Sequence, residues 1–335
     1  MKRAGFEKLW VVAEQHAPDG RFPTVRFPNP EEPGALDLSL ALAEQVKADL
    51  LLVNDPDADR LAVGARDRRG ALQTLTGNEV GVLLGHYLLT RTEPRPKRPL
   101  VISTIASSPQ LGEIARRLGA RYAETLTGFK WIANRALQLE REEQAQFLLG
   151  FEEALGYAVG LAVRDKDGIT AALAVADMAS WCASRESTLL DYLEQIQREH
   201  GVFVSVQKSV AYPGGDGAAT IARILDRFRQ RPPVELDGFR VLSSKDYLTG
   251  EWRLGNDLRR LDLPPSNVLS YELSESARVT LRPSGTEPKI KYYFELAERV
   301  LAGEPVDAAR DRAGQKIKRL QQALIAASEA KSARG

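Results

Sequence analysis

Apolar runs and apolar residues at helical spacing alternate along the chain. Continuous apolar segments such as Leu50–Val53 and Leu100–Ile105 predict buried strands. Between such segments, apolar residues recur every three or four positions, as in Leu36–Lys47, which is typical of a helix with one buried face. Because strands and helices alternate in this way, the sequence predicts an α/β fold.

The same pattern predicts the individual elements. Strands are expected at Leu9–Val12, Leu50–Val53, Leu61–Ala65, Leu100–Ile105, Ala120–Glu124, Gln146–Phe151, Val202–Val210, Ala277–Arg282 and Lys289–Leu296. Helices are expected at Leu36–Lys47, Glu79–Leu89, Pro109–Leu118, Ile169–Ala183, Ala218–Arg229 and Asp307–Ala327, with one more between Ser187 and Gly201. Asn78 is the expected N-cap of the second helix. The helix Ile169–Ala183 is apolar nearly all round and is therefore expected to be buried.

Length and composition narrow the class of protein. The chain has 335 residues, more than one packed unit usually holds, and we expect three domains, at residues 1–76, 77–200 and 201–335. A net charge of +1 without a basic stripe argues against binding to nucleic acid or to a membrane surface. No apolar stretch approaches the roughly 20 residues of a membrane span. The single cysteine, Cys182, rules out an intrachain disulfide and suits a cytoplasmic protein.

Three aspartates follow the apolar strand Leu50–Val53 at every second position. In an extended segment Asp55, Asp57 and Asp59 point the same way, so their carboxylates can converge on one point. Converging carboxylates repel one another unless a cation joins them, and hard oxygen ligands suit Mg²⁺. The sequence therefore favours a magnesium site over the alternative, a polar turn whose aspartates cap backbone donors.

Two other aspartate motifs are rivals at this loop. An EF-hand requires glycine at the sixth position and glutamate at the twelfth, where this chain has Arg60 and Arg66, so it is excluded. A phosphatase of the haloacid-dehalogenase type also has an aspartate pair after an apolar strand. Such enzymes normally continue with a small hydroxyl residue, and here Asp59 and Arg60 occupy that region. A magnesium-dependent phosphatase therefore stays only as a weaker alternative.

Two further loops carry groups that can bind a sugar phosphate. The segment Arg282–Pro288 combines a guanidinium and hydroxyls that can grip phosphate oxygens, although taken alone it is more typical of a strand-connecting turn. Glu152 and Glu153 end the strand Gln146–Phe151, where they can accept hydrogen bonds from sugar hydroxyls or cap the next segment. Lys166 by itself indicates only a solvated charge.

Taken together and in this order, the loops resemble those of the α-D-phosphohexomutase superfamily. DPDADR is similar to its metal loop, GFEEALGY to its sugar-recognition loop and RPSGTEPK to its phosphate-binding loop. The resemblance extends over essentially the whole chain, including LTGFKWI and DKDG, and is closest to the branch of phosphopentomutase, glucose-1,6-bisphosphate synthase and bacterial phosphoglucomutases. It implies a truncated multi-domain architecture, with mixed α/β sheets and a smaller C-terminal α+β domain that binds phosphate.

The resemblance also implies a role for each matching residue. Asp55, Asp57 and Asp59 would bind Mg²⁺, and Arg60 would lie beside a phosphoserine. Glu152, with Glu153 next to it, would hold sugar hydroxyls. The remaining implied contacts are Gly128 and Lys130 in a loop lining the cleft, Lys166 on substrate phosphate, and Arg282, Ser284, Gly285 and Thr286 around the non-reacting phosphate.

The phosphoserine itself has no counterpart, because the family's loop of threonine, alanine, serine, histidine, asparagine and proline does not occur in these residues. In the family that serine gives a phosphoryl group to a sugar phosphate, and the resulting bisphosphate returns its other phosphoryl group. We therefore expect a mutase of glucose or pentose phosphates whose chain alone turns over little substrate. Its expected ligands are sugar monophosphates and bisphosphates, and its expected partner is a missing N-terminal part or a second copy. The alternative is an inactive fragment or subunit that binds sugar phosphates.

Overall fold

The chain forms two compact units, Met1–Ile196 and Gln197–Gly335, in a computed structural model that describes residues 1–160, 162–285 and 287–329. We call them the first and the second unit and describe each by itself. Both combine helices with sheets, so the predicted α/β class and multi-domain architecture are confirmed. Among the described helices, none combines the length and the apolar character that crossing a bilayer requires.

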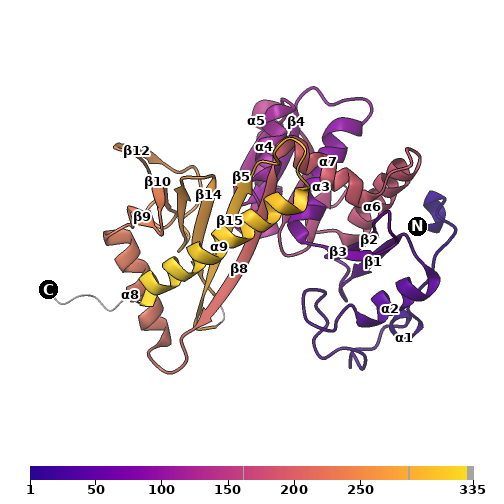
Figure 1. Ribbon diagram of the computed structural model, residues 1–335, viewed down its shortest axis with the longest axis horizontal. Coiled ribbons are helices and arrows are strands. Elements are labelled where there is room, and N and C mark those ends of the chain that lie inside the picture. The colour runs from indigo at the N-terminus through magenta and orange to yellow at the C-terminus, as the bar shows by residue number, and fades with distance from the viewer. Residues whose placement is uncertain (161, 286, 330–335) are drawn as a thin grey trace. The chain divides into compact units, whose positions relative to one another are not determined.

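Two sheets organise the described part of the first unit (Figure 1). One is antiparallel, in the order β1-β2-β3, and the other has the order β5-β4-β6-β7, with β5, β4 and β6 parallel and β7 antiparallel to β6. The strands are β1 Leu50–Asn54, β2 Leu61–Arg66, β3 Leu72–Leu75, β4 Pro99–Thr104, β5 Arg121–Thr125, β6 Gln146–Glu152 and β7 Gly156–Val159. The helices are a 3₁₀ turn at Lys2–Ala4, α1 Ala13–His16, α2 Asp37–Val46, α3 Gly77–Arg91, α4 Gln110–Arg117, α5 Phe129–Glu143, α6 Gly168–Ala183 and α7 Leu189–His200.

Helices α3 and α6 close the core of the first unit. Val80, Leu83 and Leu84 of α3 are buried together with Phe151 of β6 in one apolar cluster. Gly81 of α3 has no room for a side chain, since a Cβ there would lie 2.5 Å from the Phe151 ring. This close approach of helix to strand places the N-terminus of α3 directly against the loop that follows β6.

Three predictions about the helices and strands of this unit are wrong. Leu9–Val12 forms no strand, and Trp10 and Val11 are 53% and 59% exposed. Asn78 is not the N-cap of α3: Thr76 caps it in a capping box with Glu79, while Asn78 accepts a hydrogen bond from the Ser108 backbone at 2.8 Å. Helix α6 is not buried all round, since Ile169 is 65% exposed. An apolar segment is buried only where another part of the protein packs against it, and its own sequence does not show whether this happens.

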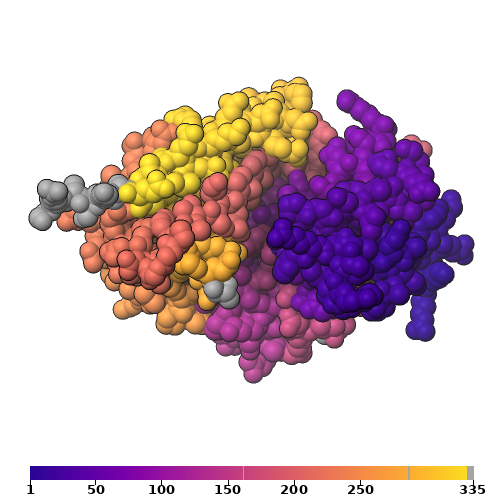
Figure 2. Space-filling view, turned by 90° about the horizontal axis from the view of Figure 1, so that it is seen from below, coloured from indigo at the N-terminus to yellow at the C-terminus, as the bar shows by residue number. Residues whose placement is uncertain are grey.

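The second unit is one antiparallel sheet covered by helices. The described strands follow the order β12-β11-β10-β13-β14-β15-β8, with β9 paired to β10. Their bounds are β8 Val202–Ala211, β9 Glu235–Leu236, β10 Phe239–Asp246, β11 Glu251–Leu254, β12 Asp257–Arg260, β13 Leu269–Leu273, β14 Ala277–Pro283 and β15 Lys289–Glu298. The helices are α8 Gly217–Gln230 and α9 Val306–Glu329, and Figure 2 shows α9 (yellow) along the surface of this unit.

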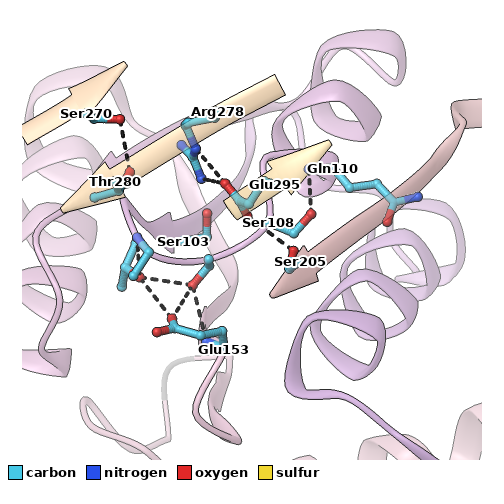
Figure 3. A network of polar contacts seen from close by, with 12 residues as sticks. Ser103, Ser108, Gln110, Glu153, Ser205, Ser270, Arg278, Thr280 and Glu295 are labelled. Atoms are coloured by element: carbon cyan, nitrogen blue, oxygen red, sulfur yellow. Dashed lines mark hydrogen bonds and ion pairs between the residues drawn. The ribbon is translucent and has the colours of Figure 1, made fainter. Parts of the chain in front are cut away.

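The two faces of this sheet differ in chemistry because successive strand residues point to opposite sides. Val279 and Leu281 of β14 are buried in the same apolar cluster as residues of α8 and α9. Arg278 and Thr280, which alternate with them, make polar contacts: Arg278 pairs with Glu295, and Thr280 exchanges a hydrogen bond with Ser270 at 3.0 Å (Figure 3). The helices therefore cover one face, and a polar network occupies the other.

Candidate functional site

The three predicted metal ligands lie in the loop that joins β1 to β2. Each of Asp55, Asp57 and Asp59 offers a carboxylate oxygen, and these oxygens all lie within 4.8 Å of one another. Asp55 is buried, Asp59 is half-buried and Asp57 is exposed. The loop is a turn rather than an extended strand, because Ala58 has a positive φ of 56° and its backbone N–H donates to the Asp55 carbonyl at 2.9 Å. The turn, not strand alternation, brings the carboxylates together.

Arg60 holds Asp55 in place from the other end of the loop. The Arg60 backbone N–H donates to Asp55 Oδ1 at 3.0 Å, and its Nε donates to Asp55 Oδ2 at 2.6 Å. Burial alone would raise the pKa of the Asp55 carboxyl, but the hydrogen bonds and the charge of Arg60 bring this pKa below its ordinary value. Arg60 also donates to Asn29 Oδ1 at 2.9 Å, a contact that the sequence did not predict.

Lys166 pairs with Asp59 although 106 positions separate them in the sequence. The distance between Lys166 Nζ and Asp59 Oδ2 is 2.9 Å, and the lysine side chain is 26% exposed. Burial alone would lower the pKa of the Lys166 ammonium, but its hydrogen bond to Asp59 and the negative charge of Asp59 raise this pKa overall. Lys166 is therefore not a solvated surface charge, since its ammonium is paired with a carboxylate of the predicted metal loop.

Backbone contacts fix this loop to its neighbours. The N–H of Gly168, at the start of α6, donates to the Ala58 carbonyl at 3.0 Å, and the N–H of Leu61 donates to the Leu155 carbonyl at 3.0 Å. Gly168 fits because it lacks a side chain: a Cβ there would lie 2.4 Å from the Arg60 carbonyl oxygen. The metal loop, the sugar loop and the start of α6 thus form one continuous site.

The donor set of the metal loop fits Mg²⁺. Three carboxylates, all oxygen donors, surround one point, and Mg²⁺ is bound by a few such carboxylates while waters or phosphate oxygens complete its shell. The exposure of Asp57 leaves that point open on one side. The residues that would hold the ion are Asp55, Asp57 and Asp59.

The predicted sugar loop lies where the parallel strands of the first unit end. Strands β5 and β6 both run parallel to β4, so Gly128 after β5 and Glu152 at the end of β6 reach the same edge of the sheet. There the Gly128 backbone N–H donates to Glu152 Oε1. Gly128 has a φ of 122°, which a residue with a side chain rarely adopts. Glu152 thus fixes the loop at Gly128, a link that the sequence did not predict.

Glu153 faces the end of β4. Its Oε2 accepts a hydrogen bond from Ser107 Oγ at 3.0 Å, and its backbone N–H donates to the same Ser107 oxygen at 3.2 Å. The Glu153 side chain therefore supports the sugar loop from inside the protein. Lys130, the other predicted residue of this edge, is exposed, and its Nζ lies 5.0 Å from the centroid of the Trp131 ring.

The predicted phosphate loop belongs to the second unit, between β14 and β15. The Ser284 backbone N–H donates to the Lys289 carbonyl at 2.9 Å and closes the loop. Arg282 pairs in register with Lys291 of β15, and its guanidinium forms no ion pair or hydrogen bond with any residue that the structure describes. A Cβ at Gly285 would meet nothing within 4 Å, so the fold itself does not require glycine there. Thr286 lies outside the described residues.

Comparison with protein families agrees with this geometry. Residues 1–70 match the family described as "Phosphoglucomutase/phosphomannomutase, alpha/beta/alpha domain II". Residues 76–199 match "alpha/beta/alpha domain III" of the same family, and the two matches together cover more than half of the chain. The chain belongs to the phosphoglucomutase/phosphomannomutase family. The resemblance drawn from the three loops is thereby confirmed, and the first unit holds both matched domains.

Named members of this phosphomutase family are similar along most of the chain. A "Probable phosphomannomutase" of Haemophilus influenzae is 39% identical over 310 residues, which are 90% of this chain and 59% of that protein. The human "Phosphopentomutase" is 38% identical over 301 residues, 85% of this chain and 48% of the relative. This family member therefore spans roughly half to three fifths of the length of these relatives.

A solved structure from the family shows the same fold. The crystal structure of parafusin, a phosphoglucomutase from Paramecium, in its open form superimposes with a TM-score of 0.64 at 19% sequence identity. The superposition covers 91% of this chain and 51% of parafusin. At this identity the likeness supports the phosphomutase architecture only.

Proposed function

We propose that this chain supplies the metal-, sugar- and phosphate-binding parts of a phosphosugar mutase that interconverts the 1-phosphate and the 5- or 6-phosphate of glucose or a pentose. One observation carries the proposal: in the first unit, the metal loop is joined to the sugar loop through Leu61 and Leu155, and Lys166 pairs with Asp59 of the metal loop. In the proposed reaction a phosphoserine gives its phosphoryl group to a sugar hydroxyl, and the bisphosphate then returns the other phosphoryl group to the serine.

Each binding residue has a distinct part in this proposal. Asp55, Asp57 and Asp59 hold Mg²⁺, which when bound neutralises negative charge on phosphoryl oxygens. Arg60 stabilises the phosphoserine, and Glu152 orients sugar hydroxyls. Lys166 contacts substrate phosphate, and Lys130 lies with Gly128 in a loop that lines the cleft. In the second unit, Arg282, Ser284, Gly285 and Thr286 bind a phosphate group that does not react.

The carrier serine is not among these 335 residues, so we propose that they bind sugar phosphates without sustained turnover unless the carrier is added. Phosphorus NMR with glucose 1-phosphate and ribose 1-phosphate, each with a trace of its bisphosphate, checks this. We expect no mutase product from the chain alone and product once a family domain bearing the serine loop is supplied. No product in either case, with sugar phosphate still bound, would instead support the alternative of a binding subunit.

Two observations bear on the remaining proposals. A nucleophilic Asp55, as the phosphatase alternative requires, is disfavoured because both of its oxygens accept hydrogen bonds from Arg60 and its side chain is only 1% exposed.

For location, we propose the cytoplasm. Cys182 is buried, and burial raises the pKa of its thiol to about 11, as expected of a packed cysteine in a reduced protein.

Replacing Arg282 with alanine tests the phosphate loop. We expect roughly tenfold weaker binding of glucose 1-phosphate, because a bidentate guanidinium contact to a phosphate is lost. Calorimetry on the whole chain measures the affinity. Arg240→Ala is the matched control, since Arg240 is an exposed arginine on β10 of the same unit. Equal affinity in Arg282→Ala and the unaltered chain would remove this loop from the proposal.

A further inference from the structure

Lys166 and Arg60 neutralise two of the three carboxylates that the proposal assigns to Mg²⁺. Arg60 Nε lies 2.6 Å from Asp55 Oδ2, and Lys166 Nζ lies 2.9 Å from Asp59 Oδ2. Three carboxylates with two cationic side chains give a formal charge of −1, which a divalent ion changes to +1. The ion and the two cationic side chains therefore compete for the same oxygens.

The two cationic side chains differ in how firmly they are held. Arg60 follows Asp59 directly in the chain, and its backbone N–H also donates to Asp55, so it is part of the loop. Lys166 reaches the loop from a different segment through a flexible side chain, and its ammonium makes its one described ion pair with Asp59. Lys166 is therefore the partner that can leave when an ion binds.

The path of the lysine side chain leads past the sugar loop. A Cβ at Gly156 would lie 2.6 Å from Lys166 Cδ and 3.0 Å from the Phe129 ring, so the missing side chain of Gly156 makes the room in which Lys166 extends. Lys166 Nζ is 5.8 Å from the centroid of the Phe129 ring, and the charge of Glu152 also acts on Lys166. An ammonium released from Asp59 consequently stays at the edge where Glu152 ends β6.

We propose that Lys166 exchanges between two partners: Asp59 while the metal loop holds no ion, and the substrate's phosphate once a divalent cation has taken Asp59. Metal binding then has two effects, since it changes the charge of the loop from −1 to +1 and frees an ammonium for an anion. Metal and sugar phosphate bind with positive coupling, and each raises the affinity for the other by the same factor. This inference rests on the proposed function and adds a coupling between its two ligands.

Substituting Lys166 with methionine tests separately the two parts of this proposal, the competition of Lys166 with the cation for Asp59 and the binding of phosphate by Lys166. Methionine keeps an unbranched apolar side chain beside Gly156 and Phe129 but removes the charge that competes for Asp59. With MnCl₂ as the only ligand, Lys166→Met is expected to bind Mn²⁺ roughly three- to fivefold more tightly than the unaltered chain. Glucose 1-phosphate is expected to raise Mn²⁺ affinity by about fivefold or more in the unaltered chain and by much less in Lys166→Met.

Calorimetry and the electron paramagnetic resonance of free Mn²⁺ measure both quantities without turnover. Lys97→Met is the matched control, because Lys97 is an exposed lysine of the same unit whose charge makes no described contact. Lys166→Gln serves as a second variant, and both are first checked for folding by circular dichroism.

The outcomes distinguish this inference from the proposed function. No Mn²⁺ binding by the unaltered chain would overturn both. Mn²⁺ binding that is equal or weaker in both Lys166 variants would overturn the exchange at Asp59 and leave the magnesium site standing. Tighter Mn²⁺ binding with undiminished coupling to glucose 1-phosphate would show that Lys166 leaves Asp59 but does not take the phosphate, which also overturns the proposal.

Discussion

Replacing Asp55 with asparagine is expected to lower the affinity of the chain for Mn²⁺ by about 100-fold or more. Residues that only support a metal ligand already change affinity by about 10- to 100-fold, and Asp55 is proposed as a ligand itself. Asparagine has nearly the same shape and can still accept the Arg60 backbone N–H, but it leaves the guanidinium of Arg60 without its carboxylate partner at 2.6 Å. Calorimetry with MnCl₂ measures the loss.

The same variant is expected to lower the free energy of unfolding of the first unit by about 1–2 kcal/mol, because a charge-assisted hydrogen bond to a buried oxygen is weakened. Asp49→Asn is the matched control, since Asp49 is exposed and immediately precedes β1, whereas Asp55 follows it. Unchanged Mn²⁺ affinity in Asp55→Asn, with binding intact in the control, would contradict the assignment of the metal to this loop.

The sequence predicted the convergence of Asp55, Asp57 and Asp59, but for an incomplete reason. Alternating aspartates after an apolar strand are a local pattern, and local patterns can be read from one sequence. The convergence of their oxygens depends on the turn at Ala58, whose positive φ the pattern did not indicate. The pairing of Asp59 with Lys166 depends on the missing Cβ of Gly156, a steric condition between segments that no spacing rule contains.

The helices and strands that could be predicted are likewise those with a clear local sequence pattern. Strands β4 and β6 were predicted within one or two residues because both of their faces are covered, which leaves continuous apolar runs. Helix α5 was missed although Ile132, Ala136 and Leu139 recur at helical spacing, because charged residues surround them. Strands β11 and β12 were missed because they expose most of their side chains and are held by hydrogen bonds to neighbouring strands.

The substitution Gly77→Ala is expected to have the largest effect on stability. Gly77 opens α3 against the sugar loop, and a Cβ there would lie 1.9 Å from the Glu153 carbonyl oxygen and 3.0 Å from the Leu155 nitrogen. These are backbone atoms, so a change of rotamer cannot relieve the overlap, and either α3 or the loop must move. We expect the free energy of unfolding of the first unit to fall by about 2–4 kcal/mol and its Tm by roughly 5–10 °C.

Urea denaturation followed by tryptophan fluorescence measures this loss, because Trp10, Trp131 and Trp181 lie in the first unit and only Trp252 lies in the second. Gly20→Ala is the matched control: Gly20 belongs to the same unit, and a Cβ there would meet nothing within 4 Å. Because Gly77 abuts the loop that carries Glu152, the displaced loop should also bind glucose 1-phosphate less tightly at temperatures where the variant stays folded. A Gly77→Ala chain as stable as Gly20→Ala would mean that α3 and the sugar loop do not pack as closely as described, and the support proposed for Glu152 would fail with them.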